Sequence, residues 1–314
     1  MKSINLIEPF QLYNLLNQVN HGTPCVSNEY YLVLFDPRKL DEFTESHVVT
    51  SRYIKCDDSS DTFEIPKNID YSAVRYLVVI DNRASSQKDV ASPAIRLADK
   101  LWQMGSKFPV NVVKGGYEEF SALYPFLRSQ QRILSQCEME NFSTYPIEIE
   151  PGFLYIGLRS QAMLPAVIKN LKVKAHINLT LQEDKVFAVD DTVYGKNREL
   201  VPQLLQIPSK DSLKSDLQTH FLTCCSFIDQ HRRNDGKSVV IYSELGISRN
   251  VTIALCYLMH HHKISLKDAL QRVQTCHFYV CPNQSFIKAL LEWEEKLLGS
   301  QLTEPSDLGF LSYN

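Results

Sequence analysis

Short apolar runs alternate with amphipathic segments along most of the chain, and the runs end in polar or glycine-containing turns. Runs of this length are typical of buried strands, whereas the segments between them have the period of helices. Strands that alternate with helices form parallel sheets with helices on both faces. The sequence therefore predicts an α/β fold. The expected strands are 30–35, 77–80, 110–113, 153–156, 175–178 and 238–242, and the expected helices are 9–19, 91–104, 117–127, 161–171, 211–230, 249–262, 266–275 and 283–298.

A polar stretch near the middle divides this pattern into two halves. The chain has 314 residues, which at roughly 150 residues per domain is enough for two domains. We predict a first domain at 1–130, a linker at 131–150, a second domain at 151–298 and a disordered tail at 299–314. The tail contains Gly, Ser and Pro without a hydrophobic period. We expect residues 186–200 to form a surface loop.

The composition argues against several functional classes. A formal net charge of −3 is unlike the strongly basic balance of dedicated nucleic-acid binders. No window offers the ~18 consecutive apolar residues of a membrane span. The eight cysteines are scattered, which favours reduced thiols in an intracellular protein over a disulfide framework. Residues 1–15 lack the features of a secretory signal or an Arg-rich presequence. We therefore expect a cytoplasmic location and leave mitochondrial and nuclear pools open.

The most informative segment is residues 239–250, which read Val-Val-Ile-Tyr-Ser-Glu-Leu-Gly-Ile-Ser-Arg-Asn. A buried strand enters a tight loop, and the loop enters a helix. Backbone N–H groups in such a loop, together with the helix N-terminus, attract anions. An Arg at the start of the helix supplies a bidentate fork for phosphate. The other interpretation is a turn that only connects strand and helix. The candidate phosphate-binding residues are Ser243, Glu244, Leu245, Gly246, Ile247, Ser248 and Arg249.

This segment resembles the signature of the cysteine-dependent dual-specificity phosphatases, which is His-Cys-x-x-Gly-x-x-Arg followed by Ser or Thr. Gly246 and Arg249 match the signature. Tyr242 replaces the histidine, Ser243 replaces the nucleophilic cysteine, and Asn250 replaces the trailing hydroxyl residue. The resemblance runs from about residue 153 to 298 and includes Leu154–Gly157, His176–Thr180 and Pro282-Asn283.

These replacements bear directly on catalysis. A loop of this kind can lower the pKa of a thiol, whose reference value is near 8.5, by several units. A serine hydroxyl ionises far above neutral pH and needs a partnered base, which Tyr242 is not. The resemblance implies that Asp211 stands where the family has its general acid. Asp is also a good N-cap, so the competing role for Asp211 is to cap the helix that follows it.

The N-terminal half resembles a rhodanese domain. The resemblance rests on three segments: the strand ending in Asp36-Pro37-Arg38, the segment Glu45–Val49, and the turn within Asn111–Tyr117. Active rhodaneses carry a persulfide cysteine in the loop that corresponds to residues 81–88, which contain none. Sulfur transfer is therefore expected to be lost. In MAP kinase phosphatases this domain docks kinases through a basic cluster.

Only Arg52 and Lys55 lie near the place of that cluster, and Asp57-Asp58 follows them. Solvated surface charge is therefore an equally good interpretation of these residues.

As a whole, the chain resembles the pseudophosphatases of the serine/threonine/tyrosine-interacting group, in the MAP kinase phosphatase-like form with a rhodanese-like N-terminal domain. The resemblance implies an inactive adaptor that binds phosphoproteins, an active phosphatase or a MAP kinase, for example to inhibit a partner phosphatase. The alternatives are a weak phosphatase that uses Ser243 and a sulfurtransferase. We expect no metal, no cofactor and no nucleic-acid partner.

Overall fold

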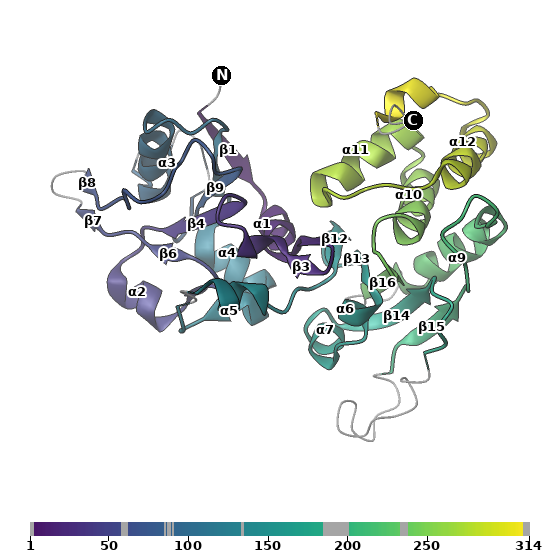
Figure 1. Cartoon of the computed structure of the whole chain (residues 1–314), viewed down its shortest axis with the longest axis horizontal. Coiled ribbons are helices and arrows are strands. Elements are labelled where there is room, and N and C mark those ends of the chain that lie inside the picture. The colour runs from purple at the N-terminus through teal and green to yellow at the C-terminus, as the bar shows by residue number, and fades with distance from the viewer. Residues whose placement is uncertain are drawn as a thin grey trace. The chain divides into compact units, whose positions relative to one another are not determined.

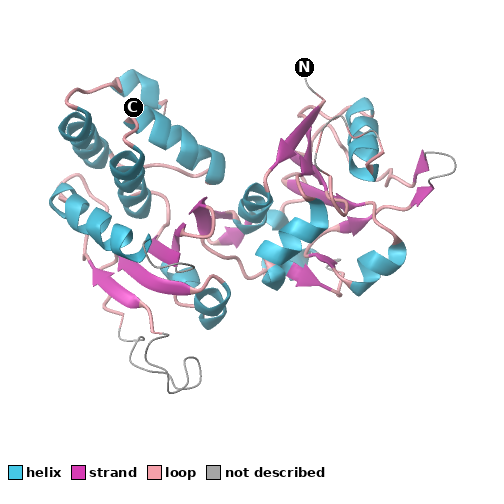
Figure 2. Ribbon diagram, turned by 180° about the vertical axis from the view of Figure 1, so that it is seen from behind, coloured by secondary structure: helices cyan, strands magenta, loops and turns pink. Residues whose placement is uncertain are grey.

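The computed structural model divides the chain into two compact units, Met1–Thr144 and Tyr145–Asn314. It describes residues 3–57, 62–84, 86, 89, 91–132, 135–184, 201–232 and 238–309. Both units contain a sheet with helices around it (Figures 1 and 2), so the predicted α/β class is confirmed. The loop expected at 186–200 lies outside the described residues. None of the helices within the described ranges combines the length and apolarity that a membrane span requires.

The first unit is built on a parallel sheet in the order β1-β10-β9-β4-β6. Val33 and Val79 face the helix α3 (Pro93–Gln103) and share a core with it. Leu34 and Val78, which alternate with them, are also buried. Both faces of the sheet are covered, which is why its strands form continuous apolar runs. The strands are β1 (Ile4–Ile7), β4 (Leu32–Asp36), β6 (Arg52–Tyr53), β9 (Tyr76–Val79) and β10 (Val110–Val113).

Short elements complete the first unit. The further helices are α1 (Pro9–Asn17), η1 (Cys25–Ser27), α2 (Leu40–Glu45), α4 (Gly116–Leu123), η2 (Pro125–Leu127) and α5 (Gln136–Glu140). The two-residue strands pair as β2 (Val19–Asn20) with β3 (Thr23–Pro24), β5 (His47–Val48) with β11 (Arg128–Ser129), and β7 (Cys56–Asp57) with β8 (Thr62–Phe63).

The segment expected to be a linker, 131–150, contains regular structure instead. Helix α5 lies against η1, where the Gln136 side chain donates to the Ser27 carbonyl at 2.7 Å. Strand β12 (Ile147–Glu150) joins the sheet of the second unit. The polar composition suggested a solvated connection, but contacts with residues distant in sequence order both ends of this segment.

The second unit has a sheet in the order β12-β13-β16-β14-β15. Only β12 runs antiparallel to its neighbour among these described strands. All six residues of the central strand β16 are buried, because parallel strands pair with both of its edges and helices pack against it. The strands not yet given are β13 (Leu154–Leu158), β14 (Val173–Asn178), β15 (Gln203–Gln206) and β16 (Ser238–Ser243).

Helix α10 (Arg249–His262) is the central helix of the second unit. It follows directly from the loop after β16, is buried along its first eleven residues, and packs against three other helices (Figure 1). These are α9 (Phe221–Arg232), α11 (Leu266–Cys276) and α12 (Gln284–Leu298). The shorter helices of the unit are α6 (Arg159–Ala162), α7 (Pro165–Asn170), η5 (Gln218–His220) and η6 (Pro305–Leu308).

Three predicted helices differ from the observed ones. The segment 117–127 is α-helical only as far as Leu123, and the short helix η2 follows Tyr124. The segment 161–171 is broken into α6 and α7, because Pro165 favours the first turn of a helix and interrupts the one before it. The segment 211–230 becomes helical only at Gln218. Ser212 and Ser215 hydrogen-bond to each other at 2.9 Å in the irregular part. Short polar side chains of this kind compete with helical backbone bonds.

The predicted disordered tail at 299–314 is wrong for residues 299–309, which the structure describes as ordered. Thr303 and Leu308 are buried. The buried carboxylate of Glu294 in α12 accepts the N–H groups of Leu302 and Thr303, each at 2.9 Å, and that of Leu266 at 2.6 Å. One carboxylate thus holds the tail against α11 and α12, a long-range contact that local composition does not reveal.

Glu294→Ala should lower the free energy of unfolding by about 3 kcal/mol or more, because it leaves buried backbone donors without an acceptor. Urea unfolding followed by circular dichroism measures the effect. Glu295→Ala removes an exposed neighbouring carboxylate in the same helix and is the matched control. Equal losses in the two variants would contradict a structural role for the Glu294 carboxylate.

Candidate functional site

The candidate loop connects the carboxyl end of β16 to the first turn of α10. Gly246 has φ +72°, a left-handed conformation that glycine adopts without strain. A Cβ at this position would also stand 3.1 Å from the Leu158 side chain. The strand–loop–helix predicted for 239–250 is therefore present, with its glycine at the position that needs one.

Ser243 occupies the end of the strand and is 1% exposed. Its Oγ accepts the Gly246 N–H at 3.1 Å and donates to Asn250 Oδ1 at 3.2 Å. An amide oxygen is an acceptor but not a base at neutral pH. The Ser243 hydroxyl is therefore satisfied within the loop, and its proton lies on a group that cannot remove it.

Asn250 joins the loop to its surroundings. It is fully buried, and its amide nitrogen donates to the carbonyls of Gly246 at 3.1 Å and Gly157 at 3.3 Å. Together with its bond to Ser243, these contacts use both ends of the side-chain amide. Asn250 thus connects the loop to β13 by bonds that a serine or threonine is too short to reproduce as a set.

Arg249 is the first residue of α10, and its side chain is 5% exposed. Its Nη1 donates to the carbonyls of Leu179 at 3.0 Å and Ser209 at 2.6 Å. Its Nη2 forms an ion pair with Glu244. Its Nε is buried and has no hydrogen-bond partner among the described residues; the Asp211 carboxylate lies 3.8 Å away. The guanidinium is thus oriented on one edge by backbone oxygens and faces two carboxylates on the other.

Some of the predicted loop residues are buried and others are exposed. Glu244 and Leu245 are exposed, Leu245 at 65%, while Gly246 and Ser248 are buried and Ile247 is half-buried. The exposed part of the loop therefore presents the carboxylate of Glu244 and the apolar side chain of Leu245 to solvent.

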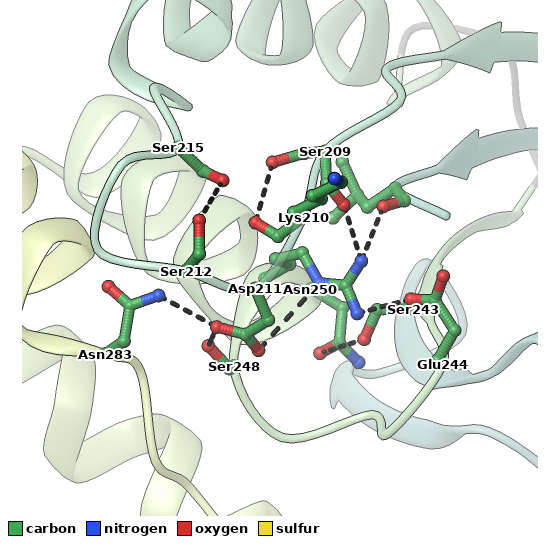
Figure 3. A network of polar contacts seen from close by, with 12 residues as sticks. Ser209, Lys210, Asp211, Ser212, Ser215, Ser243, Glu244, Ser248, Asn250 and Asn283 are labelled. Atoms are coloured by element: carbon green, nitrogen blue, oxygen red, sulfur yellow. Dashed lines mark hydrogen bonds and ion pairs between the residues drawn. The ribbon is translucent and has the colours of Figure 1, made fainter. Parts of the chain in front are cut away.

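Asp211 reaches the loop from the segment after β15 (Figure 3). Its Oδ1 accepts the Ser248 hydroxyl at 3.0 Å and the Asn283 side-chain amide at 2.8 Å. Asn283 also caps α12 through the Phe286 N–H. The expectation that Asp211 caps a following helix is wrong, because the next helical residue is Gln218. Asp211 instead closes the side of the loop next to Arg249.

Tyr242 belongs to a buried network that the sequence did not indicate. Its hydroxyl donates to Asp184, whose carboxylate also accepts the Asn178 amide at 2.6 Å and pairs with Arg159 at 2.6 Å. The His176 and Tyr242 rings form a T-shaped contact, with centroids 5.4 Å apart. Burial, followed by the bond to Asp184, raises the pKa of Tyr242 far above its ordinary value. The phenol therefore remains protonated and acts as a donor.

His277, which directly follows α11, contacts the loop and was missed by sequence reasoning. It is 6% exposed, and its Nε2 donates to the Gly246 carbonyl at 3.2 Å. Burial lowers its pKa to about 4, although the bond to Gly246 acts in the opposite direction. His277 therefore supports the loop as a neutral imidazole whose Nε2 is engaged with a backbone carbonyl.

In the first unit, the carboxyl ends of β4 and β9 border a cavity of about 470 Å³ lined by residues that include Arg38, Cys56 and Asp81. Arg38 forms a buried ion pair with Asp36 at 2.7 Å. Asp81 accepts the Ala84 N–H at 2.7 Å and the Ser92 hydroxyl at 2.5 Å. Of the loop 81–88, residues 85, 87 and 88 lie outside the described residues.

The basic residues considered for kinase docking, Arg52 and Lys55, are sequence neighbours of Tyr53 and Cys56, which line this cavity. Lys55 pairs with Glu64 at 2.7 Å, and both side chains are well exposed. Arg52 is exposed at the sheet edge. Asp58 lies outside the described residues. Since Lys55 has an acidic partner on its own surface, the local positive charge is smaller than the sequence suggested.

Metal-ligating side chains do not gather in this part of the chain or in the rest of the described residues, where no group of three or more His, Cys, Asp or Glu could hold an ion.

A known family matches part of this chain. Residues 154–296 match the family described as "Dual specificity phosphatase, catalytic domain". This part of the chain has the dual-specificity phosphatase fold. We refer to Tyr145–Asn314 as the phosphatase-like unit.

Named relatives match over a longer stretch. Dual specificity protein phosphatase 5 of Rattus norvegicus is 31% identical over 215 residues, which are 62% of this chain and 53% of the relative. Dual specificity protein phosphatase 1 of Homo sapiens is 31% identical over 206 residues, which are 59% and 53% of the two chains. The chain therefore spans about half the length of the curated relatives it matches.

Among solved structures, the human tyrosine phosphatase-like serine/threonine/tyrosine-interacting protein is 26% identical. The match covers 49% of this chain and 98% of that one, with a TM-score of 0.39.

The neutral His277 makes the phosphatase-like unit sensitive to acid. In the unfolded chain His277 takes up a proton near pH 6.5, whereas in the folded protein its pKa is about 4. The contribution of His277 to the free energy of unfolding is therefore fully present above pH 6.5 and is lost as the pH falls toward 4. His277→Gln keeps a donor for Gly246 and should reduce the loss of unfolding free energy between pH 7 and 5 by on the order of 2 kcal/mol.

The measurement is urea unfolding at both pH values, followed by Trp293 fluorescence in a Trp102→Phe background. His220→Gln, which changes an exposed histidine, is the control. A wild-type pH dependence in His277→Gln would contradict the assignment of this acid sensitivity to His277.

Proposed function

We propose that the phosphatase-like unit is a non-catalytic binding module. The single observation that carries this proposal is the environment of Ser243, whose hydroxyl donates to the Asn250 amide oxygen and accepts the Gly246 N–H. A thiolate at this position would be stabilised by the loop amides, but an alkoxide would need a base. The imidazole next to the loop, His277, donates to a carbonyl. Ser243 is therefore not activated as a nucleophile, and His277 is not positioned to act as its base.

As an adaptor, the protein would bind phosphoproteins or an active phosphatase and modulate signalling, for example by inhibiting that phosphatase. The loop supports this role because Arg249 and the helix N-terminus are retained although the catalytic groups are not. The resemblance to MAP kinase phosphatases points to MAP kinase signalling and includes a MAP kinase among the candidate partners. We place this activity in the cytoplasm, with mitochondrial or nuclear pools as further sites.

The N-terminal unit would contribute a second binding surface. Its parallel sheet and the buried Asp36–Arg38 pair support a rhodanese-like domain. The sequence of loop 81–88 contains no cysteine. This argues against sulfur transfer, and a null result with thiosulfate and cyanide would agree. The domain is therefore proposed as an interaction domain, with kinase docking weakened by the Lys55–Glu64 pair.

The second candidate function is a weak phosphatase in which Ser243 attacks phosphorus and Asp211 protonates the leaving group. Asp211 lies beside Arg249, which favours this idea. However, its Oδ1 already accepts two hydrogen bonds, from Ser248 and Asn283. This function requires a covalent phosphoserine at position 243. Its detection by mass spectrometry after incubation with substrate would favour the second candidate over the first.

Purified wild-type protein should not turn over an aryl phosphate above the level of Ser243→Ala. Tyr242→His combined with Ser243→Cys should raise turnover at least about a hundredfold, because the thiolate is restored within a retained loop. Adding Asn250→Ser tests whether the buried amide limits the rescued activity. Wild-type turnover that is lost in Ser243→Ala would overturn the non-catalytic assignment. A folded but inactive triple variant would mean that the wider pocket has also diverged.

Partners that use the loop should depend on Arg249. Affinity capture from cells with wild type and with Arg249→Ala should show a subset of proteins that is lost in the variant, since the guanidinium is the loop's cationic group. Lys210→Ala removes an exposed cation nearby and controls for charge. Because Arg249 is buried, melting temperatures are measured for each variant, and Arg249→Lys, which keeps the charge but not the bidentate fork, is a second test. An unchanged set of partners would show that binding takes place on another surface.

A further inference from the structure

The guanidinium of Arg249 has one edge that the fold does not fully satisfy. The Leu179 and Ser209 carbonyls hold Nη1, and this fixes the direction of the opposite edge, Nε and Nη2. That edge is the parallel pair of N–H groups that binds a carboxylate or phosphate bidentately. Glu244 contacts it at Nη2, while the buried Nε has no hydrogen-bond partner among the described residues.

Glu244 is held there weakly by other groups. Its side chain is 41% exposed, and its Oε1 accepts the Leu181 N–H at 3.4 Å, near the limit of a hydrogen bond. Only the Glu244 end of this ion pair is exposed, because the Arg249 side chain is 5% exposed. The Glu244 carboxylate can therefore move into solvent, provided that an incoming anion takes its place on the buried guanidinium.

Asp211 cannot take the place of Glu244. Its Oδ2 lies 3.8 Å from Nε, beyond hydrogen-bond distance, and its Oδ1 is held by Ser248 and Asn283. It does add a second negative charge beside the loop. An incoming oxyanion therefore meets the carboxylate of Glu244 on Nη2 and the nearby charge of Asp211.

We propose that Glu244 is a built-in competitor for the phosphate site of this loop. Its carboxylate covers the Nη2 half of the binding edge, and a phosphoryl group binds by displacing it and engaging Nε and Nη2 together. The native loop is thus an anion site kept at low affinity by its own second residue. This inference rests on the proposed function, since it describes how the same loop selects phosphorylated partners.

The test is the affinity for inorganic phosphate, measured by isothermal titration calorimetry on the full chain at constant ionic strength. Glu244→Gln should bind phosphate about tenfold tighter than wild type, because the ion pair and the repulsion of the dianion are both removed. Arg249→Ala in the Glu244→Gln background should abolish the gain. Glu295→Gln removes the same charge from an exposed site on α12 and should bind like wild type.

An affinity in Glu244→Gln no higher than in wild type, whether both bind or neither does, would overturn the proposal. An equal gain in Glu295→Gln would also overturn it, because net charge would then explain the effect. Glu244→Ala, with melting temperatures for all variants, keeps the result independent of one substitution. Aryl phosphate turnover is measured in parallel. Turnover by the wild type would overturn the proposed non-catalytic function, whereas an unchanged phosphate affinity in Glu244→Gln would overturn the role proposed for Glu244. The two failures are therefore distinguishable.

Discussion

The buried guanidinium of Arg249 is the interaction on which the phosphatase-like unit is organised. A charge with a 5% exposed side chain needs partners inside the protein, because burying an unpaired charge costs many kcal/mol. Its partners come from three places: the carbonyls that follow β14 and β15, the carboxylate of Asp211, and Glu244 in the loop itself. The guanidinium therefore ties the carboxyl ends of parallel strands to the start of α10. This arrangement fixes the loop after β16 relative to the segments that follow β14 and β15.

The substituted positions are not simply vacated catalytic positions. Tyr242 donates to Asp184 within a network that includes Asn178 and Arg159. Ser243 and Asn250 bond to each other and to the loop backbone. In a low-dielectric interior, polar groups that satisfy one another stabilise the fold and have little capacity left for chemistry. The same bonds that make the degenerate loop stable are thus the physical basis for proposing that it binds rather than reacts.

Much of the fold could be predicted from local pattern. Strand β10 and helix α10 have the bounds that the sequence predicted, because a continuous apolar run and a long helical stripe are each set by residues adjacent in sequence. The strands β1, β12 and β15 were missed. Strand β15 lacks a buried run, and β12 lies in a segment whose polar surroundings suggested a linker. The helix expected from Asp211 was wrong because short polar side chains favour irregular backbone there.

By itself, the sequence determined the strand–loop–helix, the glycine at its turn, the arginine at the start of its helix, and the tyrosine, serine and asparagine at positions 242, 243 and 250. These follow from residue identity and spacing within twelve residues. Only the tertiary structure decided what those residues touch: Asp211 against Ser248 and Asn283, Tyr242 against Asp184, His277 on Gly246, and Glu244 on Arg249. The partners come from segments up to dozens of residues away. Their positions depend on how strands and helices pack, which no local pattern encodes.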